Sequence, residues 1–225
     1  MKAEWIVREG RPDLLLFFNG WGMDRRLVDH LMSTGFAPGG HDLVMLFDYR
    51  ELALPAGVAE GLAGYRSVDL VAWSLGVWAA MHAGLDGIGR AVALNGTPFP
   101  IDAERGIPPG IFRGTLDNWS DATRGRFERR MFAGFESDLR LDAVRSGRSS
   151  ADQKEELRSI AAAASGTAAL PDSPWRFTKA VIGGKDLIFP PENQRSAWQG
   201  TEVDEIADMP HFPFFHLAGW PEATA

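Results

Sequence analysis

Residues 68–80 place a serine where a nucleophile could act. An apolar run leads into the pentapeptide AWSLG (72–76), and an apolar segment with helical spacing follows. A serine on a tight turn from a strand into a helix, with small residues two positions before and after it, is typical of hydrolases that form an acyl-enzyme. Ala72 replaces the usual first glycine but is small enough for such a turn. We therefore interpret Ser74 as the nucleophile, rather than as a simple cap for the following helix.

Acyl transfer also needs two hydrogen-bond donors aimed at the charge that develops on the substrate oxygen. One would be the backbone N–H of Leu75, which directly follows the serine. The other would come from the loop NGWGMD (19–24) after an apolar run, and we assign it to the N–H of Trp21. Gly20 and Gly22 give this loop the freedom to point that N–H inward. The alternative is an ordinary Asn-Gly turn, but the serine motif farther along the chain favours an oxyanion loop.

Two later segments could supply the acid and the base. Asp186 ends the sequence VIGGKD (181–186), which places a carboxylate at the C-terminal end of a strand. His211 comes last, in MPHFPFFH (209–216), so the chain order is serine, acid, histidine. Asp186 would hold the imidazole in one tautomer and stabilise its charged form. His216 is a rival base, and a solvated turn is the alternative for Asp186.

Continuous apolar runs are spaced along the chain as buried strands would be. They occupy residues 14–18, 43–47, 68–72, 91–94 and 179–182, and a further strand is predicted at 203–206. Helical spacing between the runs, clearest at 75–85, predicts strands that alternate with helices. The sequence therefore predicts an α/β fold of the α/β-hydrolase type, with a mostly parallel sheet and helices on both faces.

Residues 99–174 interrupt this alternation. They contain no clear strand, and helical spacing is found at 122–132 and 149–163. We predict that this segment is a helical insertion that forms a lid. Residues 1–225 then make a single α/β-hydrolase domain, a length that one hydrophobic core can support.

Bulk composition excludes several other classes of protein. The formal net charge is −7 and the pI is about 5.3, which argues against nucleic-acid binding. The absence of cysteine excludes disulfides, zinc sites built on cysteine and a thiol nucleophile. The N-terminus shows no signal-peptide pattern, and no apolar run is long enough for a membrane span. We predict a cytoplasmic monomer that binds neither nucleic acid nor membrane and uses no metal ion or cofactor.

Several of these segments together resemble the BioG family. The likeness is carried by FFNGWGMD (17–24), AWSLGVWAA (72–80) and LNGTPFPID (94–102). The later segments GIP (106–108), GGKD (183–186) and HFPF (211–214) add to it. The resemblance extends over nearly the whole chain and is weakest between residues 134 and 171.

Members of that family are pimeloyl-ACP methyl ester esterases of biotin synthesis. The resemblance implies that this chain removes the methyl ester from the pimeloyl chain on acyl carrier protein, giving pimeloyl-ACP and methanol. It also implies triad roles for Ser74, Asp186 and His211, and oxyanion-hole roles for Trp21 and Leu75.

The implied partner is an acidic carrier protein, which would dock on basic side chains. The predicted lid offers five candidates, namely Arg113, Arg124, Arg126, Arg129 and Arg130. The alternative is a solvated helix face on which these arginines pair with the carboxylates interspersed among them.

Other functions remain open. The same triad would serve a general carboxylesterase or thioesterase that acts on another acyl substrate. A non-catalytic binding protein of this fold would usually lack a triad member, and here each member has a candidate. An acyltransferase would use the same nucleophile and acyl-enzyme, with an alcohol in place of water.

Overall fold

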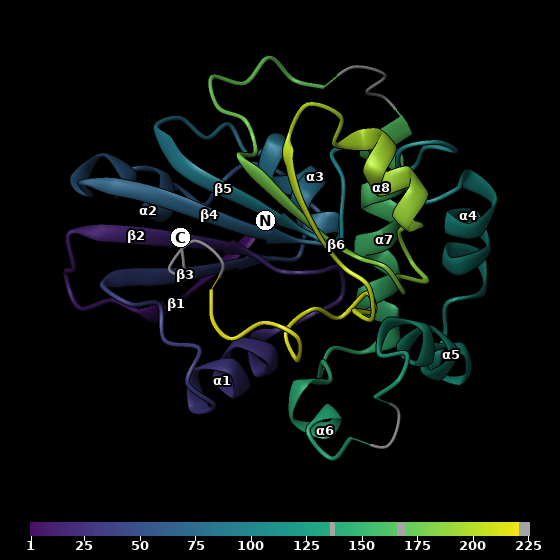
Figure 1. Cartoon of the computed structure of the whole chain (residues 1–225). Helices are drawn as coiled ribbons and strands as arrows, with labels where there is room; N and C mark the ends of the chain where they lie inside the picture. The colour runs from purple at the N-terminus through teal and green to yellow at the C-terminus, as the bar shows by residue number, and fades with distance from the viewer. Residues whose placement is uncertain (136–137, 166–169, 221–225) are drawn as a thin grey trace.

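One mixed seven-stranded sheet runs through the computed structural model, which describes residues 1–135, 138–165 and 170–220 (Figure 1). The strand order is β1-β3-β2-β4-β5-β6-β7. β1 is antiparallel to β3, and the other neighbouring pairs are parallel. The strands are β1 (Lys2–Val7), β2 (Asp13–Phe18), β3 (His41–Phe47), β4 (Ser67–Trp73), β5 (Ile88–Leu94), β6 (Lys179–Gly183) and β7 (Glu202–Ile206). The predicted mostly parallel sheet is thereby confirmed.

Side chains of the central strands point alternately to two hydrophobic cores, one on each face of the sheet. In β2, Leu14, Leu16 and Phe18 belong to one core, whereas Leu15 and Phe17 belong to the other. Because both sets are fully buried, the strand is one continuous apolar run in the sequence. This pattern is what made β2 to β6 predictable.

The apolar pattern does not predict β1, which lies at one edge of the sheet. Its sequence KAEWIV mixes charged and apolar residues, and its side chains are exposed or half-buried. It pairs with β3 from Lys2 opposite Phe47 to Val7 opposite Leu43. An edge strand that is only partly covered gives no continuous apolar run, so the sequence lacks the signal.

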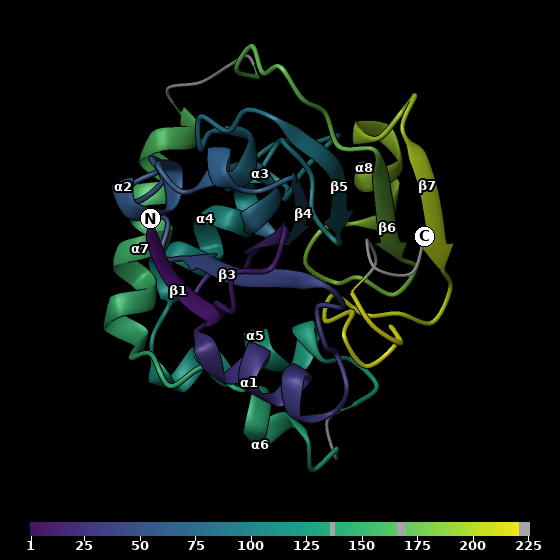
Figure 2. The same ribbon diagram turned by 90° about the vertical axis from the view of Figure 1, so that its left-hand side faces the viewer.

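Helices cover both faces of the sheet. They are α1 (Arg25–Ser33), α2 (Ala56–Ala59), α3 (Leu75–Met81), α4 (Pro109–Asn118), α5 (Asp121–Met131), α6 (Leu141–Val144), α7 (Ser150–Ser165) and α8 (Pro191–Ala197). α1 and α6 lie together on one side of the sheet (Figure 2). α3 and α7 pack on the core of the other side. None of the described helices is long and apolar enough to cross a membrane.

α3 ends at Met81, earlier than the predicted end at residue 85. His82 leaves the helical region with φ −101° and ψ 2°, and Gly84 adopts the left-handed φ of 68°. A glycine in this conformation ends a helix even where the apolar spacing continues.

The long connection between β5 and β6 contains α4 to α7, which gather beyond one end of the sheet (Figure 1). α5 and α7 match the helices predicted at 122–132 and 149–163 within two residues at each end. α6 packs on α1, and α7 packs on the core of the opposite face. The segment is thus helical and anchored to both faces, while its action as a lid stays a prediction.

Candidate active site

A strained turn between β4 and α3 presents Ser74. The backbone of Ser74 has φ 59° and ψ −130°, a region that residues other than glycine rarely adopt. Its side chain makes no capping hydrogen bond to α3, so the helix-cap alternative does not describe it. The Oγ atom instead lies 2.9 Å from the Nε2 atom of His211.

Neighbouring backbone packs so closely around this turn that two glycines are required. A Cβ atom on Gly76 would lie 2.5 Å from the carbonyl oxygen of Phe18. One on Gly96 would lie 2.3 Å from the carbonyl oxygen of Ser74. Ala72, in contrast, is fully buried with its methyl group accommodated, so alanine can stand where glycine is usual.

Ser74, His211 and Asp186 form one continuous chain of hydrogen bonds. The Nε2 atom of His211 lies 2.9 Å from Ser74 Oγ, and its Nδ1 atom lies 2.9 Å from Asp186 Oδ2. With Asp186 ionised, its carboxylate only accepts, so Nδ1 carries the proton and Nε2 can accept the serine proton. The residues are buried, with exposed fractions of 6% for Ser74, 1% for His211 and 3% for Asp186.

Asp186 is oriented by donors from its own loop and from α8. Its Oδ1 atom accepts from the backbone N–H of Ile188 at 2.7 Å and of Phe189 at 2.9 Å. Its Oδ2 atom accepts from Nε2 of Gln194 at 3.0 Å in addition to His211. The solvated-turn alternative therefore does not describe this buried carboxylate.

Asn95 and Trp73 hold the loop that carries His211, and the sequence did not single them out for this role. The Nδ2 atom of Asn95 donates to the carbonyl oxygens of Pro210 at 2.8 Å and His211 at 3.0 Å. Its Oδ1 atom accepts from the N–H of Gly183 at 2.6 Å. The Nε1 atom of Trp73 donates to the His211 carbonyl oxygen at 2.9 Å. The only sequence signal for Asn95 is an Asn-Gly pair after a strand, which also marks ordinary turns.

His216, the rival base, lies elsewhere. Its ring centroid is 5.3 Å from that of Phe135, and burial lowers the pKa of its imidazole. The structure therefore brings His211, and not His216, into contact with Ser74 and Asp186.

Trp21 and Leu75 line the same cavity as Ser74. None of the described residues accepts a hydrogen bond from the backbone N–H of either residue, so both N–H groups are free to bind a substrate oxygen. The Trp21 side chain is fixed, because its Nε1 atom donates to the carbonyl oxygen of Gln153 at 2.8 Å. Both residues therefore line the cavity beside Ser74, and their role as an oxyanion hole stays a prediction.

The cavity beside Ser74 is small, about 30 Å³, and its lining is mainly apolar. Besides the three residues above, it is lined by Ile107, Ile111, Phe112, Thr115, Phe127, Arg130, Leu157 and Ile188. Burial lowers the pKa of the Arg130 guanidinium, the one charged group among these residues. Such walls suit an aliphatic acyl chain. In the described part of the chain, no three or more His, Asp or Glu residues are grouped to hold a metal ion.

Nearly the whole chain matches one family model, that of BioG, described as pimeloyl-ACP methyl esterase, over residues 1–223. This chain belongs to the BioG family. Its structure is similar to the crystal structure of BioG from Haemophilus influenzae, with a TM-score of 0.87 and 32% identity over 99% of both chains. An α/β hydrolase enzyme from a deep-sea metagenome library has a TM-score of 0.61 at 13% identity, over 99% of this chain and 90% of that one. The predicted α/β-hydrolase fold and BioG resemblance are confirmed.

A sequence relative of this chain is a much longer protein than the chain itself. A malonyl-[acyl-carrier protein] O-methyltransferase of Bacteroides fragilis is 42% identical over 192 residues. The match covers 84% of this chain and 37% of that protein, so the chain spans little more than a third of the relative's length.

The arginines predicted to contact a carrier protein differ in their surroundings. Arg124 pairs with Glu128 at 2.9 Å and donates to the carbonyl oxygens of Ser146 and Arg148. These contacts therefore hold together parts of the insertion between β5 and β6. Such internal pairing is the alternative that the sequence left open, and it applies to this arginine.

The other four arginines are not fixed in this way, and Arg130 among them is half-buried beside the cavity. Arg113, Arg126 and Arg129 are exposed, and none of the described carboxylates forms an ion pair with them or with Arg130. Arg126 and Arg130, four residues apart on α5, both line a groove that continues from the cavity.

Proposed function

We propose that this chain is a serine carboxylesterase that hydrolyses the methyl ester of pimeloyl-ACP, releasing pimeloyl-ACP and methanol in biotin synthesis. The observation that carries the proposal is the hydrogen-bond chain from Ser74 through His211 to Asp186 at an apolar cavity. The match of the BioG model over residues 1–223 supports the substrate. The Bacteroides fragilis relative, named for O-methylation of malonyl-ACP, supports a carrier-bound methyl ester as well.

In the first half of the proposed reaction, His211 takes the hydroxyl proton of Ser74 while Oγ attacks the methyl ester carbonyl carbon. The carbonyl oxygen becomes an oxyanion, which the backbone N–H groups of Trp21 and Leu75 would stabilise. Asp186 stabilises the imidazolium through Nδ1–H. The bond from carbon to the methoxy oxygen then breaks, His211 protonates that oxygen, and methanol leaves.

In the second half, water takes the place of methanol. His211 accepts a proton from the water as it attacks the acyl-enzyme, and the oxyanion forms again in the same site. His211 returns the proton to Ser74 Oγ when the bond to the serine breaks. The product is a free carboxylate at the end of the pimeloyl chain.

The shape of the cavity orients the substrate in this proposal. The methyl ester must lie at Ser74, so the methylene chain lies along the apolar walls and the thioester end points outward. The groove lined by Arg126 and Arg130 would then face an acidic carrier protein. Because α4, α5 and α7 supply most of the walls, movement of the insertion as a lid would admit the acyl chain.

The direct test is hydrolysis of pimeloyl-ACP methyl ester by the purified protein beside its Ser74→Ala variant. We expect methanol release by the wild type and a loss of at least about 10³-fold in the variant. Cleavage of p-nitrophenyl butyrate without cleavage of the carrier ester would retain the hydrolase and reject the biotin substrate. If neither ester is cleaved and a fluorophosphonate does not label the protein, the non-catalytic binding protein would be favoured.

A further inference from the structure

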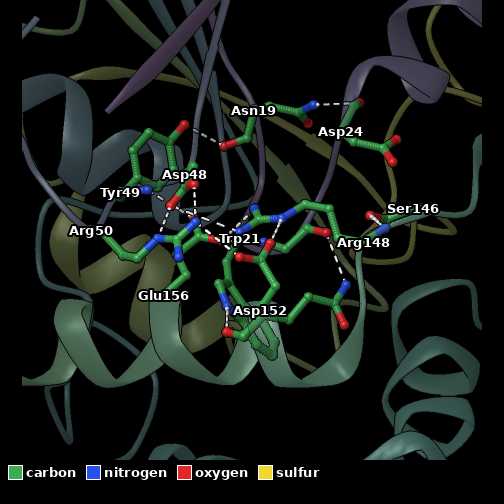
Figure 3. A network of polar contacts seen from close by, with 12 residues as sticks. Asn19, Trp21, Asp24, Asp48, Tyr49, Arg50, Ser146, Arg148, Asp152 and Glu156 are labelled. Carbon is green, nitrogen blue, oxygen red and sulfur yellow. Dashed lines mark hydrogen bonds and ion pairs between the residues drawn. The ribbon is translucent and has the colours of Figure 1, made fainter.

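Helix α7 holds the loop that carries the Trp21 N–H group (Figure 3). The indole Nε1 of Trp21 donates to the backbone carbonyl oxygen of Gln153 at 2.8 Å. The Nε2 atom of Gln153 donates to the carbonyl oxygen of Gly22 at 2.9 Å. The N–H of Gly22 donates to Oε2 of Glu156 at 3.2 Å. Thus α7 fixes both the side chain of Trp21 and the peptide groups of the next residue.

The loop needs such contacts because glycines flank Trp21 on both sides. Gly22 adopts a left-handed φ of 72°, and a Cβ atom on it would lie 3.0 Å from Nε2 of Gln153. Gly20 and Gly22 give the backbone access to many conformations, and only some of them direct the Trp21 N–H toward the cavity.

Glu156 is fully buried and has donors on both carboxylate oxygens. Its Oε1 atom accepts from the N–H of Tyr49 at 3.0 Å, and Oε2 also accepts from Nη1 of Arg148 at 2.6 Å. Burial raises the pKa of the Glu156 carboxyl, while the charge of Arg148 and the Tyr49 N–H act in the opposite direction. Burying such a pair contributes little net stability, so its presence beside the loop points to a positional role.

We propose that Glu156 and Gln153 are positioning residues for the oxyanion hole, which fix the Trp21 N–H in the direction of the ester oxygen. The inference rests on the proposed function, since it assumes that this N–H stabilises the oxyanion. Preorganised donors act in the transition state far more than in the bound substrate. Because α7 belongs to the insertion between β5 and β6, the hole is complete only while α7 is seated on the loop.

The test compares Glu156→Gln with a matched control, Asp42→Asn. Asp42 is also a buried carboxylate that accepts from two backbone N–H groups, those of Glu9 at 2.8 Å and Gly10 at 3.1 Å. It lies near the start of β3, at the other end of the sheet from Ser74. Both substitutions keep the side-chain size and remove one acceptor.

We expect Glu156→Gln to lower kcat on p-nitrophenyl butyrate about tenfold with KM unchanged. The affinity for an alkylboronic acid, which forms a tetrahedral adduct with the serine, should fall by the same factor. Asp42→Asn should lower the melting temperature and leave both quantities at the wild-type level. If Glu156→Gln loses thermal stability like the control yet keeps wild-type kcat and boronic acid affinity, the proposal is wrong.

Gln153→Met provides a second test in case Glu156→Gln does not fold. It removes only the side-chain bond to Gly22 and should lower kcat and boronic acid affinity several-fold, again with KM unchanged. A folded Gln153→Met variant with wild-type values of both would also overturn the proposal. Failure of the proposed function gives different results: a wild type that is no serine hydrolase would cleave no ester and bind no boronic acid, and a wrong carrier substrate would leave the effects on p-nitrophenyl butyrate unchanged.

Discussion

The side chains proposed to act in the reaction depend on neighbours that never touch the substrate. Asp186 is oriented by Gln194 from α8, and the loop of His211 is tied to Asn95 after β5. The contacts of Asn95 join segments that are far apart in the sequence, whereas Gln194 follows Asp186 by only eight residues. The alignment of Ser74, His211 and Asp186 therefore depends on three loops that pack together. Loss of one of these contacts should lower kcat.

Replacement of Asp186 tests the role of the carboxylate. In Asp186→Asn the amide can donate to Nδ1 of His211 and so favours the tautomer with its proton on Nε2, which cannot accept from Ser74. We expect kcat on p-nitrophenyl butyrate to fall by about 10³- to 10⁴-fold. The matched control is His216→Ala, which should keep kcat within about twofold. A Asp186→Asn variant with near wild-type kcat, or a large loss in the control, would reassign the acid and the base.

The sequence was sufficient for the three residues of the hydrogen-bond chain but not for their supports. Ser74 lies in a local motif, and Asp186 and His211 follow from chain order. His211 and His216 are equivalent in that order, and only the contacts of His211 with Ser74 and Asp186 in the structure separate them. Asn95, Gln153 and Glu156 act through contacts with distant backbone groups, for which a single sequence carries no local pattern.

At the scale of the elements, the ends of β2 and β5 and the start of α3 meet at the serine turn. The carbonyl oxygens of Phe18 and Asn19 lie 2.5 and 2.6 Å from the place where a Cβ atom on Gly76 would be. The same β2 end leads into the loop that carries Trp21. Close approach of backbones therefore couples the proposed nucleophile to the proposed oxyanion hole.

A methyl group at position 76 should disturb both the serine turn and the loop that carries Trp21. We expect Gly76→Ala to lower the unfolding free energy by about 3 kcal/mol or more, because rigid backbone must move aside. Gly125→Ala, within α5, is the matched control, since its Cβ would meet only Nη1 of Arg129 at 3.8 Å. The control should gain about 0.5–1 kcal/mol. Urea denaturation measures both, and equal effects would contradict the packing argument.

Strands β2 to β6 were predictable as continuous apolar runs, and α5 and α7 were predictable from their helical spacing. The exposed edge strand β7 was also predicted, from residues 203–206. β1 lacks such a signal because its sequence mixes charged and apolar residues and its side chains are exposed or half-buried. The apolar spacing predicts a longer α3 than the structure has, because Gly84 adopts a left-handed conformation that a helix cannot contain. Local backbone geometry determines where a helix such as α3 ends, and the periodicity of apolar residues does not predict that geometry.

At the scale of the molecule, the insertion is tied to the edge of the sheet through Asp48. Its carboxylate pairs with Lys2 of β1 at 2.9 Å, with Arg50, and with Arg148 of the insertion at 3.8 Å. Burial alone would raise the pKa of Asp48, but the hydrogen bonds from Arg50 and Lys2 and the charge of Arg148 outweigh it. The pKa of Asp48 therefore lies well below its usual value.

This lowered pKa predicts a pH dependence of stability. A carboxyl whose pKa is lower in the folded state stabilises the fold above its unfolded pKa of about 3.9 and loses that contribution as the pH falls. We expect the difference in unfolding free energy between wild type and Asp48→Asn to be constant above about pH 5. It should shrink as the pH falls below about 4. Urea denaturation across this range measures it, and a difference that does not change with pH would contradict the ion-pair cluster.

The exposed arginines predict a carrier effect that is sensitive to salt. Arg126→Glu should lower kcat/KM for pimeloyl-ACP methyl ester about tenfold, because it repels an acidic carrier at the groove. Raising the ionic strength should lower kcat/KM of the wild type for this substrate and reduce the difference in kcat/KM between the wild type and Arg126→Glu. Kinetics on p-nitrophenyl butyrate serve as the reference, since that ester has no carrier. Equal losses on both substrates would assign Arg126 to the cavity rather than to the carrier.

Covalent labelling by a fluorophosphonate, with the modified residue mapped by mass spectrometry of peptides from the intact protein, identifies the nucleophile directly. We expect a single adduct on Ser74, with no labelling of Ser74→Ala and wild-type labelling of His216→Ala. Label on another residue, or a wild type that takes up no label, would contradict the assignment of Ser74 as the nucleophile.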